Sequence, residues 1–391
     1  MIEKKYDVVV IGAGIHGAGV AQALAVNGYS VLVLEQNTIA SGTSSRSSKL
    51  IHGGLRYLEN LHLSLVKECL QERTLLLRNA PHLVKLVPFY IPVFPETRRR
   101  PWQLRTGLSL YALLNSFHSS GRFGTVARQD WQTLDGLETK NLQKVFRYQD
   151  AQTDDVLLTR AVMNSAVQHG AQLMMPCEFV NADIDEQGVT VHYRQNGETH
   201  QSRASVVVNA AGPWVNQVLT KFNEPHIPLS IELVQGTHIV LPGELTQGVY
   251  YIEAPTDHRA VFVMPWKGNT LVGTTETSYS GDPGQVQPLD SEIDYLLKTL
   301  IHYFPHYQGK PVLDSFAGLR VLPHEEGHPF SRSRDTRLIT DRDRSPRLLS
   351  IYGGKLTAYR ITAMKVMQKL KTSLRSGSAP LIDTKGIRLD S

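Results

Sequence analysis

The first thirty-five residues restrict the fold of this chain more than any other stretch. Residues 7–11 form a short apolar, β-branched run, which is typical of a strand buried on both faces of a parallel sheet. A Gly-x-Gly-x-x-Gly sequence follows at 12–17, then an Ala-rich helical stretch at 18–26 and a second apolar run at 31–34 that stops at Glu35. This order of strand, glycine turn, helix, strand and acid predicts a dinucleotide-binding βαβ unit.

Each part of this unit has a physical task. Gly12 makes the tight turn, Gly14 lets the backbone approach a pyrophosphate, and Gly17 lets the helix pack against the strand. The N–H groups at the start of the helix can bind phosphate, and Glu35 can hold ribose hydroxyls. An ordinary glycine turn is the alternative, but it does not explain why every flanking element is in place.

Composition limits the class of protein further. Lys and Arg exceed Asp and Glu by 41 − 36 = 5, a mild excess that fits anionic ligands or an acidic membrane surface better than nucleic acid. Cys69 and Cys177 form no CxxC pair, which favours a reducing, cytoplasmic location. We find no secretory segment and no apolar run of about 18 residues that could span a bilayer. The 391 residues predict two joined domains.

A Ser-rich run at 41–48 leads into the sequence KLIHGGLRYL at 49–58. A flexible linker is one interpretation of such a run. The paired glycines beside a cation favour another, because they allow close backbone approach while the nearby hydroxyls bind a pyrophosphate or a ring carbonyl.

Together, the glycine motif and residues 44–58 closely resemble the FAD-dependent glycerol-3-phosphate dehydrogenases of the D-amino-acid-oxidase-like flavoprotein superfamily. The resemblance implies non-covalent FAD and an α/β fold, in which a discontinuous Rossmann-like FAD-binding domain joins an antiparallel-sheet substrate domain. It assigns 1–90, 146–228 and 325–391 to the FAD-binding domain, and 91–145 and 229–324 to the substrate (cap) domain.

Two later stretches resemble flavin motifs of the same family. The strand at 206–209 ends in small residues, although an ordinary strand-to-helix turn has the same pattern. At 353–357, paired glycines precede Lys355, which could stabilise the negative end of a reduced flavin or be a structural lysine. The predicted cofactor contacts are Gly12, Gly14, Ile15, His16, Gly17, Glu35, Thr43, Ser44, Ser45, Ser48, Leu50, His52, Gly53, Gly54, Val180, Ala211, Gly212, Gly354, Lys355, Leu356 and Thr357.

From residue 229 the pattern becomes β-rich and predicts an antiparallel sheet that excludes water from a hydride-transfer site. The resemblance implies a catalytic set of His238, Arg320 and Lys355 and a substrate pocket of Arg56, Tyr57, His238, Arg320 and Arg334. Arginine binds phosphate bidentately, and an imidazole can take the proton of a secondary alcohol. A structural histidine and a surface arginine remain the alternatives for these residues.

A basic cluster at 98–105 and an apolar stretch at 108–117 suit an interfacial helix on anionic lipid, or a core or dimer helix with a solvated basic end. The resemblance favours peripheral binding on the cytoplasmic membrane face, because family members pass electrons to membrane quinone. The expected partners are a phosphorylated small molecule, a quinone or other acceptor, and a membrane surface, a partner subunit or a second copy in a homodimer. Neither nucleic acid nor a metal is expected.

The family usually continues into a helical C-terminal domain, so this chain is expected to be a short form, with a polar tail at 375–391 that frays. Three functions stay open at this point. The first is FAD-dependent oxidation of sn-glycerol 3-phosphate to dihydroxyacetone phosphate with a quinone-type acceptor. The second is oxidation of another 2-hydroxy acid or an amine, and the third is a non-catalytic flavin-binding or tRNA-modifying protein.

Overall fold

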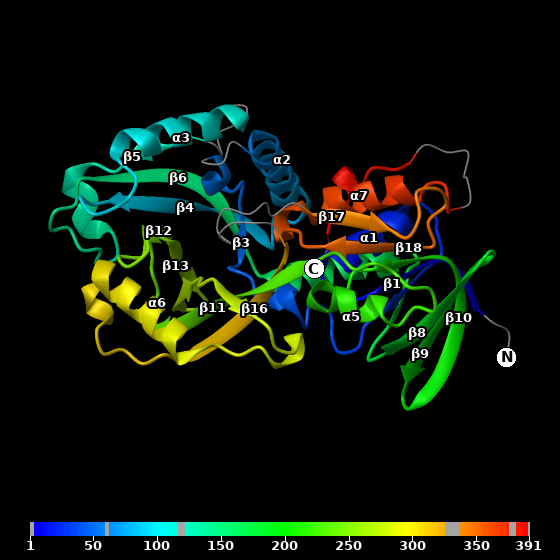
Figure 1. Ribbon diagram of the computed structural model, residues 1–391. Coiled ribbons are helices and arrows are strands. Elements are labelled where there is room, and N and C mark those ends of the chain that lie inside the picture. The colour runs from blue at the N-terminus through cyan, green and yellow to red at the C-terminus, as the bar shows by residue number, and fades with distance from the viewer. Residues whose placement is uncertain (1–3, 59–61, 116–121, 325–335, 375–380, 390–391) are drawn as a thin grey trace.

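The computed structural model describes residues 4–58, 62–115, 122–324, 336–374 and 381–389, except for the side chains of Arg56 and Tyr57. The described residues form two β-sheets, side by side along the molecule and each flanked by helices (Figure 1). The first sheet has the order β17 (Arg337–Thr340), β18 (Leu348–Tyr352), β10 (Glu198–Asn209), β1 (Lys4–Ile11), β2 (Val31–Leu34) and β7 (Gln172–Met174), with β9 (Gly188–Gln195) beside β10 and β8 (Glu178–Asp185) beside β9.

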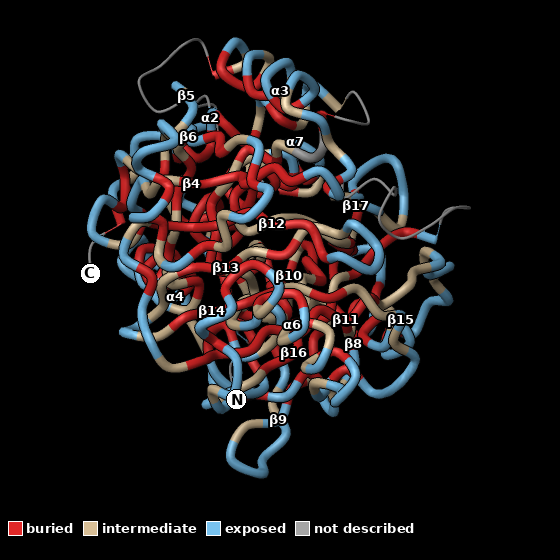
Figure 2. The backbone as a smooth tube through the Cα atoms, turned by 90° about the vertical axis from the view of Figure 1, so that its left-hand side faces the viewer, coloured by how far each residue is buried: buried red, intermediate tan, exposed pale blue. Residues whose placement is uncertain are grey.

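The centre of the first sheet is parallel and buried on both faces, as predicted. Because side chains alternate along a strand, Val8 and Val10 pack into one apolar cluster while Val9 and Ile11 pack into another. Helices α1 (Ile15–Val26), α4 (Asp155–Gln168) and α7 (Tyr359–Leu370) form the first cluster with the sheet, and the short α5 (Val215–Leu219) packs on the second. Buried strands fill the centre of the molecule and exposed segments surround them (Figure 2).

The local sequence explains several features of these helices and strands. Helix α1 begins at Ile15 rather than at Ala18, because Gly14 is its extended N-cap. Asn196 and Gly197 both have positive φ, 52° and 83°, and connect β9 to β10 in a tight hairpin. The Asp154 side chain caps α4 by accepting hydrogen bonds from the N–H groups of Val156 and Leu157.

The second sheet combines distant segments of the chain. Its order is β15 (Thr277–Tyr279), β11 (Ile231–Pro242), β14 (Asn269–Gly273), β13 (Ala260–Trp266), β12 (Val249–Glu253), β4 (Val84–Val93), β6 (Lys144–Thr153) and β3 (Leu50–Ile51), with β16 (Asp314–Pro323) beside β11 and β5 (Gly124–Thr125) beside β6. All of its pairs are antiparallel except β12 with β4. The predicted α/β fold class is therefore confirmed.

Helices cover both faces of the second sheet (Figure 1). On one face, α6 (Asp290–Tyr303) packs Leu296 and Leu300 against Ile239 of β11. On the other, α2 (Leu63–Asn79) and α3 (Pro101–Leu114) pack against Phe89 and Phe146. We call these the α6 face and the inner face. Strands β4 and β6 lie wholly in this sheet, although the predicted division places 1–90 and 146–228 in the FAD-binding domain.

The prediction that the C-terminal tail frays is wrong for residues 381–389. Asn27 exchanges two hydrogen bonds with the backbone of Ile382, at 3.0 and 2.7 Å. The N–H of Leu389 donates to the carbonyl of Asn79 at 2.9 Å, and the Leu389 side chain is 3% exposed. Residues far away in the sequence thus form hydrogen bonds with the backbone of the tail. The composition of the tail itself does not reveal these partners.

Candidate active site

The glycine motif at 12–17 has no room for a side chain at Gly12 or at Gly17. Gly12 has a φ of +100°, and a Cβ added to it would lie 2.8 Å from the carbonyl oxygen of Ala210. A Cβ on Gly17 would lie 1.9 Å from the carbonyl oxygen of Gly12. The loop therefore packs directly against the end of β10, where the small residues of the second predicted flavin motif begin.

Glu35 lies at the end of β2, beside this loop. Its Oε2 accepts a hydrogen bond from the N–H of Ala13 at 2.8 Å, and its Oε1 accepts one from the N–H of Asn37 at the same distance. The carboxylate is thus held where a dinucleotide ribose binds in folds of this type.

The Ser-rich run is not a flexible linker. Residues Thr43–Ser45 form a 3₁₀-helix that connects the start of α1 to the second sheet. Ser44 Oγ accepts a hydrogen bond from the N–H of Ile15 at 2.9 Å, and Thr43 Oγ1 donates to the carbonyl of Leu319 at 2.8 Å. This helix therefore places the start of α1 next to β16.

The first turn of α1 suits an anionic dinucleotide, because its N–H groups point toward the loop. His16 in this turn has a buried Nδ1 without a hydrogen-bond partner among the described residues. Burial lowers the pKa of His16 to about 4, so the ring is neutral. A Cβ on Gly354 would lie 2.1 Å from His16 Nε2, which places the closing glycine motif against α1. The glycines, Glu35 and the partnerless nitrogen together fit FAD.

The closing motif also contacts His52. The N–H of His52 donates to Thr357 Oγ1 at 3.3 Å. Lys355 stands at the N-cap position of the 3₁₀-helix Leu356–Ala358. Burial raises the pKa of the Cys69 thiol to about 11, while the charge of Lys355 acts in the opposite direction, so Lys355 lies near the buried side of α2.

A buried network that the sequence does not reveal fixes Gly53. Its N–H donates to Tyr111 Oη at 2.9 Å, and Tyr111 donates to Asp150 at 2.7 Å. Arg73 pairs with the same carboxylate at 2.6 Å, and both charged side chains are almost fully buried. The network connects α2, α3 and β6 beneath the paired glycines.

His238 lies on the inner face of the second sheet and is 2% exposed. Its ring stacks on Phe316 with the centroids 4.9 Å apart, and a Cβ on Gly273 would lie 2.1 Å from its Cδ2. Nε2 is 2.9 Å from Ser48 Oγ, while Nδ1 has no hydrogen-bond partner among the described residues. Burial, aided by the charges of Arg320 and Lys49, lowers the pKa of His238 to about 3, so the imidazole is neutral.

Arg320 lies on the same face as His238. Register pairs Val234 with Arg320 and His238 with Phe316, and alternate residues of a strand share a face. The guanidinium covers Gly236, where an added Cβ would be 2.7 Å from Nη2. Nη2 donates to Thr274 Oγ1 at 3.1 Å, and Nη1 lies 3.3 Å from Glu276 Oε1.

Two further site features were missed from the sequence. The first is the contact of Ser48, a predicted cofactor contact, with His238, the predicted base. Lys49 is 4% exposed, bonds both carboxylate oxygens of Asp155 at 2.8 and 2.9 Å, and lies 5.0 Å from the Phe316 ring centroid. Residues 49 and 155 are separated by 106 positions, and no local pattern pairs them.

For several other predicted site residues, the structure gives little or no side-chain information. Arg334 lies outside the described residues. Residues Leu55–Leu58 form a 3₁₀-helix, but the side chains of Arg56 and Tyr57 are also outside the described part of the structure. Val180 sits at an irregularity in the pairing of β8 with β9. Its role, like the other cofactor contacts, stays a prediction.

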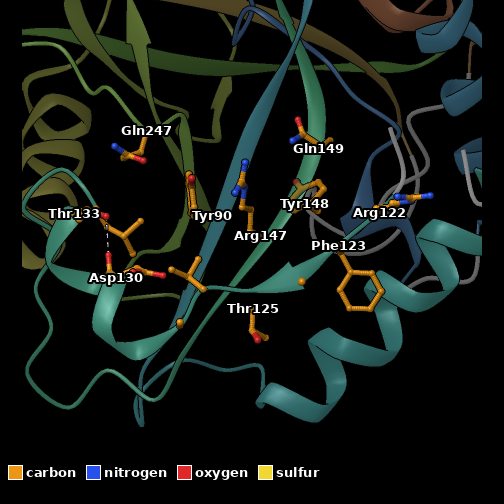
Figure 3. Close-up of a pocket in the computed structure, with 14 residues that line it drawn as sticks. Tyr90, Arg122, Phe123, Thr125, Asp130, Thr133, Arg147, Tyr148, Gln149 and Gln247 are labelled. Atoms are coloured by element: carbon orange, nitrogen blue, oxygen red, sulfur yellow. Dashed lines mark hydrogen bonds between the residues drawn. The ribbon is translucent and has the colours of Figure 1, made fainter. Parts of the chain in front are cut away.

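A separate hollow of about 570 Å³ lies on the α6 side of β4 and β6 (Figure 3). Tyr90, Arg147, Gln149 and Gln247 contribute to its lining, and none of the predicted site residues does. Tyr90 and Arg147 point away from the inner face because Phe89 and Phe146, their neighbours in the strands, occupy that face. The hollow is therefore distinct from the candidate active site.

Comparison with known proteins shows the family of this chain. A family model described as FAD dependent oxidoreductase matches residues 7–360. The chain belongs to this family of FAD-dependent oxidoreductases, and FAD is its cofactor.

Individual relatives and one solved structure show which members of the family the chain is similar to. The chain is 38% identical to a glycerol-3-phosphate dehydrogenase of Pseudomonas aeruginosa, covering 94% of this chain and 72% of the relative. It is 36% identical to D-erythritol 1-phosphate dehydrogenase of Brucella abortus, covering 93% and 73%. The structure of glycerol-3-phosphate dehydrogenase from Bacillus halodurans, complexed with FAD, superposes with a TM-score of 0.78 at 29% identity, covering 100% of this chain and 68% of that one.

Proposed function

We propose that the chain oxidises sn-glycerol 3-phosphate to dihydroxyacetone phosphate with FAD, and that a quinone-type acceptor takes the electrons. The observation that carries this proposal is the placement of neutral His238 and cationic Arg320 on one sheet face, which the 3₁₀-helix Thr43–Ser45 joins to the dinucleotide loop. The relatives that act on glycerol 3-phosphate support the choice of substrate.

The chain supplies acid–base chemistry and orientation. When bound, the flavin accepts a hydride from the carbinol carbon. His238 is the base that removes the hydroxyl proton, and its neutral state leaves one ring nitrogen able to accept that proton. Ser48 and Phe316 fix the orientation of the ring through a hydrogen bond and a stacking contact.

We assign binding of the substrate phosphate to positively charged side chains. A phosphate monoester carries nearly two negative charges and is bound best by several charged donors. Arg320 is the described member of this set, although Glu276 also lies 3.3 Å from its guanidinium. Arg56 and Arg334 are the proposed further members. Lys49 contributes positive potential at the same ring stack, although Asp155 neutralises much of it.

Replacing His238 with Ala tests the role of the base. We expect the rate of flavin reduction by glycerol 3-phosphate to fall by roughly 10²-fold to 10⁴-fold, the usual contribution of general base catalysis. Stopped-flow absorbance in the absence of oxygen measures this rate directly. His82→Ala, which removes an exposed histidine, is the control. An unchanged reduction rate in His238→Ala would assign the histidine a structural role.

A longer phosphorylated polyol is the second candidate substrate, because one relative is a D-erythritol 1-phosphate dehydrogenase. A comparison of kcat/KM for glycerol 3-phosphate, erythritol 1-phosphate, a 2-hydroxy acid and an amine distinguishes the substrate classes. The proposal predicts that glycerol 3-phosphate is the best of these. A preference for the acid or the amine would contradict the phosphate assignment.

We also propose that α3 carries the chain to an anionic membrane surface. Leu108 and Tyr111 are each 1% exposed and anchor the helix, while Trp102 and Leu113 are 68% and 54% exposed. Trp102 and Leu113 are eleven residues apart, which places them on one face of a helix. Arg99 is not part of the basic surface, because it pairs with Glu253. No helix among the described residues is long and apolar enough to cross a bilayer.

Liposome flotation tests the membrane proposal. The FAD-loaded protein should float with vesicles containing anionic lipid, and Trp102→Glu should remove most of the bound fraction because it replaces the most exposed apolar side chain of α3 with a negative charge. Leu157→Glu, on the exposed side of α4, is the matched control. If the wild-type protein stays at the bottom and sediments as a dimer that Trp102→Glu dissociates, the same face is a homodimer interface instead.

A further inference from the structure

Behind Arg320, on the α6 face of the second sheet, lies a buried carboxylate that has no contact with the candidate substrate pocket. Glu292, in the first turn of α6, is 5% exposed. Its Oε2 accepts hydrogen bonds from Gln235 Nε2 and Thr237 Oγ1, both at 2.6 Å. Its Oε1 accepts from Thr275 Oγ1 at 2.7 Å and from Thr277 Oγ1 at 2.8 Å. Burial alone would raise the pKa of Glu292, but these hydrogen bonds hold it below its usual value, so the group is ionised.

The donors to Glu292 lie on the two segments that hold Arg320. Gln235 and Thr237 flank Gly236, over which the guanidinium lies. The segment 274–277 contacts the same guanidinium, since Nη2 donates to Thr274 Oγ1 at 3.1 Å and Nη1 donates to the carbonyl of Thr275 at 3.4 Å. Thr275 Oγ1 also accepts a hydrogen bond from the N–H of Thr237 at 2.9 Å. The Glu292 carboxylate therefore holds together β11 and the segment 274–277, the two parts of the chain that contact the Arg320 guanidinium.

The same contacts reach the proposed base. Thr237 precedes His238 in β11, and side chains alternate, so Thr237 faces α6 while His238 faces the pocket. Gly273, over which the imidazole lies, is followed directly by Thr274. A shift of β11 against 274–277 would change the separation of the Arg320 guanidinium and the His238 ring.

We propose that Glu292 is a positioning residue, which sets the Arg320 guanidinium relative to His238 from the opposite face of the sheet. This inference rests on the proposed role of Arg320 in binding the phosphate. Glu292 touches neither substrate nor cofactor, and its effect passes through Gln235, Thr237, Thr275 and Thr277. Glutamine at this position keeps the shape but turns an NH₂ group toward side chains that donate to the carboxylate.

Steady-state kinetics of the FAD-loaded Glu292→Gln variant measure this effect. A misplacement of about 1 Å can cost about 100-fold, so we expect kcat/KM for glycerol 3-phosphate to fall by roughly 10-fold to 100-fold, mainly through a higher KM. The FAD content should stay at the wild-type value, because the dinucleotide loop lies on the other sheet. Asp290→Asn removes the same charge from an exposed position in the same helical turn and should leave KM unchanged.

A double-mutant cycle with Arg320→Lys separates positioning from general loss of stability. If Glu292 acts through Arg320, Glu292→Gln should change kcat/KM by less than about 2-fold in the Arg320→Lys background, since coupled positions are not additive. Equal losses in both backgrounds, or no loss in either, would overturn the inference. If Glu292→Gln does not fold, Thr275→Val replaces it in the cycle, because it removes one donor and keeps the carboxylate paired.

The cycle also separates the two proposals. An unchanged KM in Arg320→Lys would contradict the phosphate role of Arg320, whatever Glu292→Gln does. A raised KM in Arg320→Lys, together with wild-type kinetics in Glu292→Gln, would overturn only the positioning role.

Discussion

Arg320→Ala should lose turnover of glycerol 3-phosphate and keep its FAD. Arg320 supplies charge beside His238, and losing one partner of a close charge contact costs about 2–5 kcal/mol, which corresponds to roughly a 30-fold to 4,000-fold fall in kcat/KM. The side chain belongs to β16 of the second sheet, whereas Gly12, Gly17 and Glu35 lie at the edge of the first. Steady-state kinetics together with the flavin absorbance of the purified protein measure both effects.

Arg160→Ala is the control for this experiment, because Arg160 is exposed on α4 and outside the site. Wild-type kinetics in Arg320→Ala would remove this residue from the substrate pocket. Loss of FAD together with activity would show that the change damages the fold rather than the site.

Gly17→Ala should weaken FAD binding. The added methyl group would lie 1.9 Å from the carbonyl oxygen of Gly12, so either α1 or the loop must move. Overpacking of this kind costs about 1–3 kcal/mol or more, and we expect the affinity for FAD to fall by on the order of 10-fold to 100-fold. Fluorescence titration of the FAD-free protein measures the dissociation constant.

Gly107→Ala is the matched control, because Gly107 lies inside α3 and a Cβ there meets nothing within 4 Å. Alanine is the better helix former by about 1 kcal/mol, so the melting temperature should stay the same or rise while FAD binding is unchanged. Wild-type FAD affinity in Gly17→Ala would contradict the position assigned to the dinucleotide.

Local motifs made much of the fold predictable. The first βαβ unit, the Asn196-Gly197 hairpin and the Asp154 cap each depend on residues within a few positions of one another, so the sequence pattern contains their physical cause. The antiparallel strands after residue 229 were also recognisable from alternation and turns. The resemblance to a family added FAD and the substrate class.

Contacts between distant residues were not predictable in this way. Ser48 and His238 are 190 positions apart, and Asn27 and Ile382 are 355 apart. The sequence around one residue of each pair therefore contains no information about its partner. Glu292 was missed because a glutamate in the first turn of a helix has an ordinary local explanation, which is a favourable interaction with the helix dipole. Its four side-chain donors become visible once β11 and the segment 274–277 are brought together.

Anaerobic reduction of the purified FAD-loaded protein by glycerol 3-phosphate tests the central claim most directly. We expect rapid loss of the oxidised flavin absorbance at about 450 nm on addition of glycerol 3-phosphate. Glycerol should cause no loss, because it has no phosphate for Arg320 to bind. A flavin that stays oxidised with glycerol 3-phosphate, yet bleaches with a hydroxy acid or an amine, would contradict the proposed substrate and the role of Arg320 together.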